Sequence, residues 1–331
     1  MLTDILILIG GIIGILILAD IIVRESLRLA KHFKWSGTFV GLTILSIGTS
    51  IPEIMAAVIG SLNILKDPSN LNTLSGLVIG TNVGSDIFQQ SFVLALVGII
   101  GTIVVVKKNI IPEVGALIAG AVLMWIMTIG GFINRFEGFL MLAAYIAYLI
   151  YLKKKQDHDY TVKHVTEKRV KTNKLTNKRI IGEIAIILIG FVIMGLVANL
   201  VINTSEKLIS SFNMSASLFG VLLLGVASAL PELTTALIGV LKHKKGVSAG
   251  VLIGSNVTNP LFGLGLGAMI SGYAVPKVTM FYDLPAKIGI AALIFYFLYG
   301  NEKLDKWQAV ILIVIFILYL LARMKLFPVD F

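Results

Sequence analysis

Two glutamates stand in the middle of apolar stretches of this sequence, each directly after a proline. Glu53 follows Pro52, and Glu232 follows Pro231. An ionised carboxylate inside a bilayer is unfavourable by several kcal/mol unless it is partnered, so such a residue is a candidate for function. Two of them in similar surroundings predict a site that binds cations.

The surroundings of the two glutamates are copies of one another. Residues 41–53 read GLTILSIGTSIPE and residues 220–232 read GVLLLGVASALPE, at an offset of 179 with no gap. Further on, GTNV at 80–83 matches GSNV at 254–257, at an offset of 174. The repeated unit is therefore about five helices long. Because five is odd, the second copy enters the membrane from the opposite side, as in the inverted repeats of many secondary transporters, whose sites lie near the midplane.

Each proline predicts an interruption in its helix, because proline lacks a backbone donor and clashes with the preceding turn. Carbonyl groups near 46–48 and 225–227 are then free beside Glu53 and Glu232. Such backbone is tolerated at membrane depth where it lines protein or water. Carbonyl and carboxylate oxygens together supply the coordination that Ca²⁺ prefers. The two negative charges match one divalent ion, or two or more monovalent ions.

Neutral oxygen ligands surround each glutamate and recur in the second motif of each half, and they suit Na⁺. They are Thr49, Ser50, Thr81, Ser85, Ser228, Ser255 and Asn259. Any single serine or threonine in a membrane helix can instead donate to a carbonyl one turn earlier. The clustering of the whole set at repeat-related positions favours an ion site.

Asp86 is a third carboxylate candidate for the site, and its repeat partner is Pro260, so it breaks the symmetry. Three roles are open for it: a proton-binding group, an additional ion ligand, or a residue facing a water-filled vestibule. Asp20, near the end of the first apolar run, is expected to be an interfacial residue beside Arg24.

The composition is that of a polytopic membrane protein. Of 331 residues, 57% are hydrophobic and 14% charged, and the mean hydropathy is +0.93. There is no cysteine, and the four histidines lie outside the apolar cores, which argues against a thiolate or imidazole metal site. No cofactor is expected. The net charge of +10 does not indicate nucleic acid binding, because ten of the 28 Lys and Arg residues gather between 153 and 179.

Ten apolar runs of bilayer-spanning length predict an all-α fold of ten transmembrane helices, in two inverted five-helix repeats. The third and eighth are long and glycine-rich, so a bend or break is expected in each. The runs lie at about 4–23, 38–60, 74–105, 110–130, 134–152, 181–202, 216–241, 247–274, 282–300 and 307–324.

The distribution of basic residues predicts the orientation. With the N-terminus outside, inside loops hold 21 Lys and Arg residues and outside regions hold 7, with Lys287 and Arg323 among the latter. This fits the positive-inside rule. Both termini should then lie outside an inner (cell) membrane. Residues 1–152 form the first repeat, 153–180 a basic cytoplasmic linker and 181–331 the second repeat.

These motifs resemble the Ca²⁺/cation antiporter superfamily, and its prokaryotic sodium/calcium exchangers in particular. That family carries Gly-Thr-Ser-x-Pro-Glu in each half, intact here at 48–53, followed by a Gly-Ser-Asn motif like that at 254–256. The resemblance covers almost the whole chain. It implies electrogenic exchange of several Na⁺ for one Ca²⁺ by alternating access.

The resemblance also implies roles for the site residues. Glu53 and Glu232 would bind Ca²⁺, helped by Thr49 and Ser228. Flanking Na⁺ sites would use Ser50, Thr81, Ser255 and nearby carbonyls, and Ser85 and Asn259 would lie near the centre. The first and sixth helices would be the sliding elements.

Several positions depart from the family pattern. The second motif reads Ala-Ser-Ala at 227–229, so Ala229 supplies no hydroxyl where the family has serine. Thr81 replaces the usual serine and Ser85 the usual asparagine, and Asn259 is neutral where some relatives have aspartate. One Na⁺ site has thereby lost a side-chain ligand, which leaves both Na⁺ and H⁺ open as the driving ion.

The sequence therefore predicts an antiporter that exchanges Ca²⁺ for Na⁺, with a Ca²⁺/H⁺ exchanger as the alternative and a cation channel as a less favoured one. An intramembrane enzyme would need a paired-aspartate metal motif, a Ser/His dyad or a His-rich zinc site, and the apolar segments contain none of these. We expect a monomer in the lipid bilayer, with Ca²⁺ and Na⁺ or H⁺ as substrates.

Overall fold

A computed structural model describes residues 1–32, 46–101, 107–163, 177–241 and 245–330 of the chain. Within these residues, eight helical stretches are long and apolar enough to cross a membrane. They lie at Leu2–Ser26, Pro68–Ile100, Ile111–Thr128, Arg135–Lys154, Arg179–Phe212, Ala216–Ile238, Thr279–Gly300 and Lys306–Lys325. Each coincides with one of the ten apolar runs predicted from the sequence.

The other two predicted runs are built from shorter pieces. In the run 38–60, residues 38–45 lie outside the described residues, and α3 (Ser46–Thr49) and α4 (Ile51–Lys66) follow. The run 247–274 contains α13 (Lys245–Thr258), the π-helical turn η5 (Asn259–Leu264) and α14 (Gly265–Ser271). The count of ten crossings therefore stays a prediction. Of the basic linker predicted at 153–180, residues 164–176 lie outside the described residues, and the rest belongs to α8 and α9.

The remaining helices follow the predicted order, and two short strands occur that the sequence analysis did not predict. In the first half they are α1 (Leu2–His32), η2 (Pro68–Asn70), α5 (Leu71–Phe88), η3 (Gln89–Val93), α6 (Leu94–Ile100), α7 (Lys107–Thr128), β1 (Phe132–Ile133) and α8 (Arg135–Lys163). In the second half they are α9 (Asn177–Phe212), α10 (Ala216–Phe219), η4 (Gly220–Leu224), α11 (Gly225–Ser228), α12 (Leu230–Leu241), β2 (Tyr273–Ala274), η6 (Thr279–Asp283), α15 (Leu284–Asn301) and α16 (Lys306–Lys325). The π-helical turns η3 and η5 interrupt the two glycine-rich helices in which a bend or break was expected.

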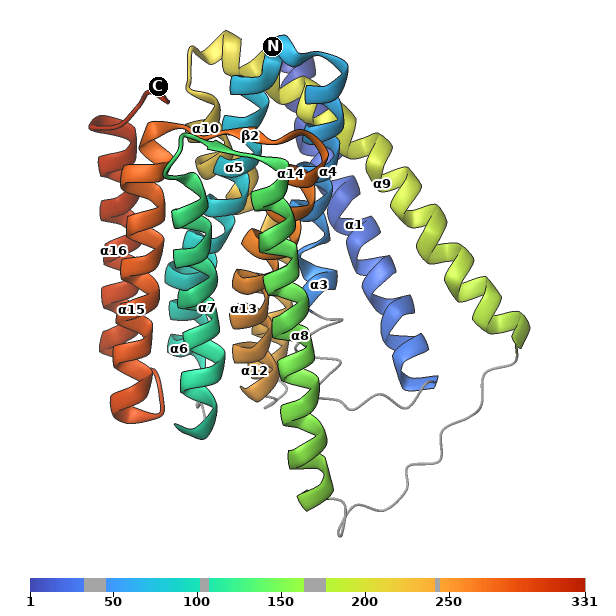
Figure 1. The fold of residues 1–331 in the computed structure, drawn as a ribbon, viewed down its shortest axis with the longest axis vertical. Helices are drawn as coiled ribbons and strands as arrows, with labels where there is room; N and C mark the ends of the chain where they lie inside the picture. The colour runs from blue at the N-terminus through green and yellow to red at the C-terminus, as the bar shows by residue number, and fades with distance from the viewer. Residues whose placement is uncertain (33–45, 102–106, 164–176, 242–244, 331) are drawn as a thin grey trace.

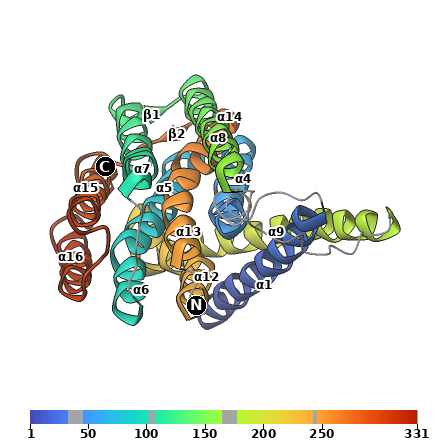
Figure 2. The same cartoon turned by 90° about the horizontal axis from the view of Figure 1, so that it is seen from below.

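The helices run side by side, and both termini lie at the same end of the bundle (Figure 1). Seen along the helices, α5 and α13 are central, α7 and α8 lie on one side, and α15 and α16 on another (Figure 2). The long helices α1 and α9 pack against each other and cross outside this bundle. Large apolar side chains are exposed along α1, α9 and α16, as lipid-facing helices require.

Each proline-glutamate pair opens a new helix just after a break. The breaks lie at Ser50, with φ −80° and ψ 2°, and at Ala229, with φ −80° and ψ 0°. Pro52 and Pro231 then take the second position of α4 and α12, where their missing N–H removes no hydrogen bond. The interruptions predicted from the prolines are thus confirmed, with nearly the same backbone angles in both halves.

Glycines bring α5 into backbone contact with the helix of the other half. A Cβ atom on Gly80 would lie 2.4 Å from the Ser217 carbonyl oxygen, and one on Gly84 would lie 2.5 Å from Cα of Val221. In the facing helix, a Cβ on Gly225 would lie 2.7 Å from the backbone nitrogen of Ser85. Small residues permit this approach in membrane helices. It places the polar residues of α5 beside the second break.

Two basic residues that the topology count assigned to outside regions lie inside the protein instead. Lys287 and Arg323 are both 0% exposed. Lys287 pairs with Asp86, and Arg323 lies 3.2 Å from Asp283, which is equally buried. Long basic side chains are retained in a protein interior when a carboxylate pairs with them. These two charges therefore belong to packed ion pairs and carry no information about orientation.

Candidate functional site

The two glutamates occupy equivalent places, in the first turn of α4 and the first turn of α12. Both Glu53 and Glu232 are 0% exposed, and they lie close enough to interact electrostatically. In the described part of the chain, no Lys, Arg or His side chain forms an ion pair with either. The positive end of each helix dipole favours the carboxylate only modestly. The pair is therefore a strongly attractive place for a cation.

Several buried oxygen atoms around the glutamates have no hydrogen-bond partner within the described residues. Buried polar atoms are normally paired, so a group of unpaired acceptors calls for a ligand. The atoms are Oε2 of Glu53, Oε1 and Oε2 of Glu232, Oγ of Ser50 and Oδ1 of Asn259. All are oxygens, the ligand type that Ca²⁺ and Na⁺ take from proteins.

A hydroxyl from each half lies near the glutamate of the other half. Thr49, at the end of α3, lies near Glu232, and Ser228, at the end of α11, lies near Glu53. Thr49 donates to the Ser46 carbonyl at 3.3 Å, and Ser228 donates to the Gly225 carbonyl at 3.2 Å. A hydroxyl that donates its proton keeps lone pairs for a cation. The back-bonding alternative and the ligand role are therefore compatible for these residues.

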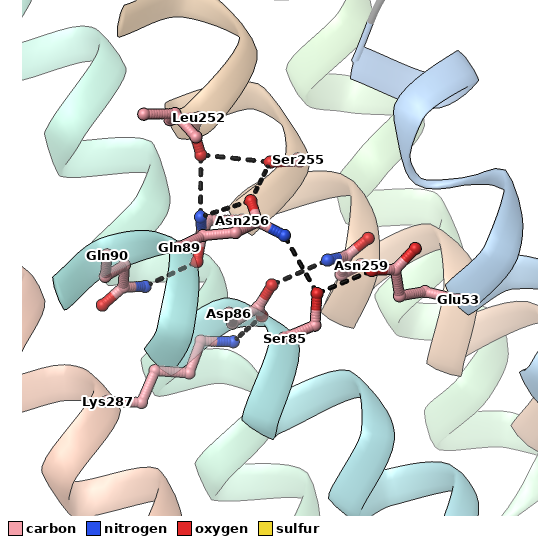
Figure 3. A network of polar contacts seen from close by, with 10 residues as sticks. All are labelled: Glu53, Ser85, Asp86, Gln89, Gln90, Leu252, Ser255, Asn256, Asn259 and Lys287. Carbon is pink, nitrogen blue, oxygen red and sulfur yellow. Dashed lines mark hydrogen bonds and ion pairs between the residues drawn. The ribbon is translucent and has the colours of Figure 1, made fainter. Parts of the chain in front are cut away.

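A chain of hydrogen bonds extends from Glu53 into the second half (Figure 3). Ser85 on α5 donates to Oε1 of Glu53 at 2.6 Å, and Gln89 Nε2 donates to Ser85 at 3.0 Å. Ser255 on α13 donates to Gln89 Oε1 at 2.5 Å. Ser85 and Ser255, predicted from separate halves, are thus joined through Gln89.

Thr81 and Asp86 are engaged by other groups. Thr81 donates to the Leu77 carbonyl at 2.7 Å, and it lines a small cavity together with Ser228. Asp86 is 0% exposed, which does not fit a residue facing a water-filled vestibule in this conformation. Its Oδ1 accepts from Asn259 Nδ2 at 2.8 Å, and its Oδ2 pairs with Lys287. Asp86 thus contacts Asn259, whose Oδ1 is one of the unpartnered oxygens.

The described residues contain no cluster of three or more His, Cys, Asp or Glu side chains that could hold a metal ion. The unpartnered oxygens of the candidate site come from two carboxylates, one hydroxyl and one amide. Such a set holds a cation less tightly than a cage of more carboxylates would, because fewer charges contribute to binding.

Comparison with known proteins identifies the family. The sequence pattern of the family described as "Sodium/calcium exchanger protein" matches residues 3–154 and 182–325, which is most of the chain. The chain belongs to the sodium/calcium exchanger family. Members of this family are membrane transporters that exchange Ca²⁺ and other cations, so this exchanger is not an enzyme.

Relatives match nearly the full length of the exchanger. The Uncharacterized membrane protein MJ0091 of Methanocaldococcus jannaschii is 26% identical, over 93% of this chain and 94% of its own. The Sodium/calcium exchanger MaX1 of Methanosarcina acetivorans is 21% identical, over 95% and 97%. A solved structure of the sodium-calcium exchanger NCX_Mj, soaked with Na⁺ and Sr²⁺, is similar in fold, with a TM-score of 0.61 and 24% identity over 95% and 96% of the two chains.

The exchanger has a cavity between α1 and the helix breaks at Ser50 and Ala229. Its volume is about 180 Å³, and Asp20, Gly48, Thr49 and Pro231 are among the residues that line it. Asp20 is half exposed and pairs with Arg24, as its interfacial interpretation predicted. The cavity connects the neighbourhood of Thr49 to the face of α1.

Sequence reasoning missed several polar residues of the site. Gln89 lies one helical turn after Ser85, so an i, i+4 pattern on one face of α5 could have found it. Thr258 bonds to Ser46 at 3.1 Å and to Tyr145 at 3.2 Å, and the sequence gives no signal for these contacts. Lys287 was treated as a topology charge because it lies near the end of an apolar run.

Proposed function

We propose that this exchanger moves Ca²⁺ out of the cell against Na⁺ by alternating access. Family membership supports cation exchange with Ca²⁺, and the site supplies oxygen ligands only. The observation that carries the proposal is the pair of buried glutamates, at matched helix breaks, whose carboxylates have unpartnered oxygens and no basic partner among the described residues.

In this proposal, Ca²⁺ binds between Glu53 and Glu232, with Thr49 and Ser228 as further ligands. Two carboxylates balance one divalent ion. Na⁺ ions bind at the flanks through Ser50, Thr81, Ser255 and the carbonyls freed by the prolines, while Ser85 and Asn259 lie at the centre. The unpartnered Oγ of Ser50 and Oδ1 of Asn259 support their part in the site.

The bare glutamates make exchange obligatory. Moving two uncompensated carboxylates through an occluded, water-free state is very unfavourable, because buried charges need a partner. Either Ca²⁺ or a set of monovalent ions removes that penalty. The empty site therefore stays open to one face, and the two kinds of ion move in opposite directions.

Na⁺ is favoured over H⁺ as the coupling ion by the environment of Asp86. The proton alternative gave Asp86 a coupling role, yet both of its oxygens are held, by Lys287 and by Asn259. Ser50 and Asn259 meanwhile offer neutral oxygens, which suit Na⁺. The alternative, a Ca²⁺/H⁺ exchanger, is tested by comparing uptake under a Na⁺ gradient with uptake under a pH gradient.

The architecture that we propose is two inverted five-helix repeats, 1–152 and 181–331, joined by a cytoplasmic linker at 153–180. The matched breaks at Ser50 and Ala229 support it, and so do η3 and η5, which each interrupt the glycine-rich helix of one half. Both termini would then lie outside. The pair α1 and α9 packs outside the central bundle, and α1 borders the cavity near Thr49, so this pair is the proposed sliding unit.

The test uses purified exchanger in proteoliposomes loaded with Na⁺ and diluted into Na⁺-free medium containing radiolabelled Ca²⁺. A parallel series replaces the Na⁺ gradient with a pH gradient. Glu53→Gln removes one site charge, and Glu302→Gln, which changes an exposed carboxylate in the loop before α16, is the matched control.

We expect Ca²⁺ uptake driven by the Na⁺ gradient, lost in Glu53→Gln and retained in Glu302→Gln. Uptake driven only by the pH gradient would replace the proposal with a Ca²⁺/H⁺ exchanger. Uptake that needs neither gradient would indicate a channel.

A further inference from the structure

An ion pair lies directly behind the candidate site, between Asp86 on α5 and Lys287 in the first turn of α15. Both side chains are 0% exposed. Figure 3 shows the contact between them. Removing two charges from water is unfavourable, and apolar residues of similar volume often replace such pairs without loss of stability. The pair is therefore poorly explained by stability alone, and its contacts indicate what else it does.

Asp86 uses its second oxygen to accept a hydrogen bond from Nδ2 of Asn259, at 2.8 Å. A carboxylate that pairs with an ammonium group acts as an acceptor only, so the amide of Asn259 must turn its NH₂ group towards Asp86. The other end of the planar amide, Oδ1, then points away from Asp86. This oxygen is buried and has no partner within the described residues.

The orientation of the Asn259 amide decides whether it attracts or repels a cation. Its Oδ1 offers lone pairs to Ca²⁺ or Na⁺, whereas its NH₂ group would present two partly positive hydrogens. On α5, Ser85 is the residue just before Asp86, and it holds the Glu53 carboxylate through its hydrogen bond. Neighbouring residues of α5 thus orient one ligand from each half.

We infer that Asp86 and Lys287 are positioning residues, which hold the Asn259 amide with its oxygen towards the ions and leave only Glu53 and Glu232 to be balanced by the transported charge. This inference rests on the proposed function. Lys287 acts as a built-in counter-charge for Asp86. It reaches Asp86 from a position 201 residues away in the chain, so the sequence alone could not pair them.

The sharpest variant is the exchange Asp86→Lys with Lys287→Asp. It keeps the buried pair, but it puts an ammonium donor beside Asn259, so the amide should turn its oxygen towards Lys and its NH₂ group towards the ions. We expect the apparent KM for Ca²⁺ to rise roughly 10–100-fold, the usual effect of changing a group that orients a metal ligand. Wild-type Ca²⁺ affinity in this variant would overturn the inference.

A double-mutant cycle separates positioning from simple packing. Asp86→Asn with Lys287→Met should raise KM in the wild-type background, but should add little once Asn259→Ala has removed the amide. If the pair only stabilised the fold, the two losses would add and the inference would be wrong. Arg323→Met breaks the comparably buried pair with Asp283 and is the matched control, expected to lower thermal stability without changing KM.

Calorimetry of Ca²⁺ binding to the purified protein in detergent keeps this test separate from the proposed function. Thermal unfolding of each variant confirms that it is folded. If wild type binds Ca²⁺ but shows no counter-ion-dependent uptake, exchange fails while the positioning inference is still decided by the binding constants. Equal Ca²⁺ affinity in wild type and in folded Lys287→Met protein would overturn the inference.

Discussion

Ser85 on α5 donates a 2.6 Å hydrogen bond to Oε1 of Glu53 on α4, while Oε2 of the same carboxylate has no partner within the described residues. One oxygen is thus held by the protein and the other is free for an ion. The bond fixes the carboxylate plane before an ion arrives, which lowers the conformational entropy lost on binding.

Replacing Ser85 by alanine should therefore weaken Ca²⁺ binding. A hydrogen bond to a charged group contributes about 1.5–3 kcal/mol, so we expect apparent Ca²⁺ affinity to fall by roughly tenfold or more. Ser91→Ala is the matched control, because Ser91 is equally buried but donates to the Ile87 carbonyl. The Ca²⁺ dependence of Na⁺-driven uptake measures both variants. Equal losses in the two would contradict the assignment of Ser85.

The two helix breaks differ in one hydroxyl, because Ser50 in the first half corresponds to Ala229 in the second. Ala229→Ser should raise the apparent affinity for Na⁺ with little change in that for Ca²⁺, since it returns the missing ligand. Ser50→Ala should have the opposite effect. The measurement is Ca²⁺ uptake as a function of internal Na⁺ concentration. Unchanged Na⁺ dependence in both variants would remove these positions from the Na⁺ sites.

Arg323 ties the end of the chain to two helices. It bonds to the Phe327 carbonyl and to Ser217, and it pairs with Asp283 and, at 3.8 Å, with Asp330. Arg323→Met leaves a buried carboxylate unpaired, which should lower the free energy of unfolding by about 3–5 kcal/mol. Thermal unfolding in detergent would show this as a lower Tm. Arg135→Met, at an exposed position of α8, should leave Tm unchanged.

The glycine contacts of α5 predict a second effect on stability. In Gly84→Ala, the added Cβ would lie 2.5 Å from Cα of Val221, so α5 and the facing helix must separate. Overpacking of this kind typically lowers stability by about 1–3 kcal/mol. Gly289→Ala is the control, because nothing lies within 4 Å of its added Cβ and alanine is the better helix former. A Tm that falls equally in both variants would mean that the close contact of α5 with the facing helix does not cause the loss of stability.

Much of the architecture could be predicted from local sequence. Pro52 and Pro231 lack a backbone donor wherever they lie, so both breaks were evident, and apolar runs of bilayer length marked the spans. Such properties depend only on neighbouring residues. Residues 48–53 and their second copy also marked the candidate ligands around Glu53 and Glu232.

Contacts between distant segments could not be predicted in the same way. Lys287 looked like a topology charge because a lysine near the end of an apolar run usually reaches the interface, and nothing local shows that Asp86 is its partner. Arg323 was misinterpreted for the same reason. Gln89 had a local signal, its spacing of four residues from Ser85, but its link to Ser255 depends on how α5 and α13 pack.

The most direct test of the exchange mechanism is Ca²⁺ efflux from proteoliposomes loaded with radiolabelled Ca²⁺. Vesicles are diluted into medium with Na⁺, with unlabelled Ca²⁺, or with neither, at equal ionic strength. The account requires that the site change the membrane face to which it opens only when the charges of Glu53 and Glu232 are neutralised. Efflux should then be rapid with either ion outside and near zero with neither. Equally fast efflux into medium that lacks both ions would contradict the account.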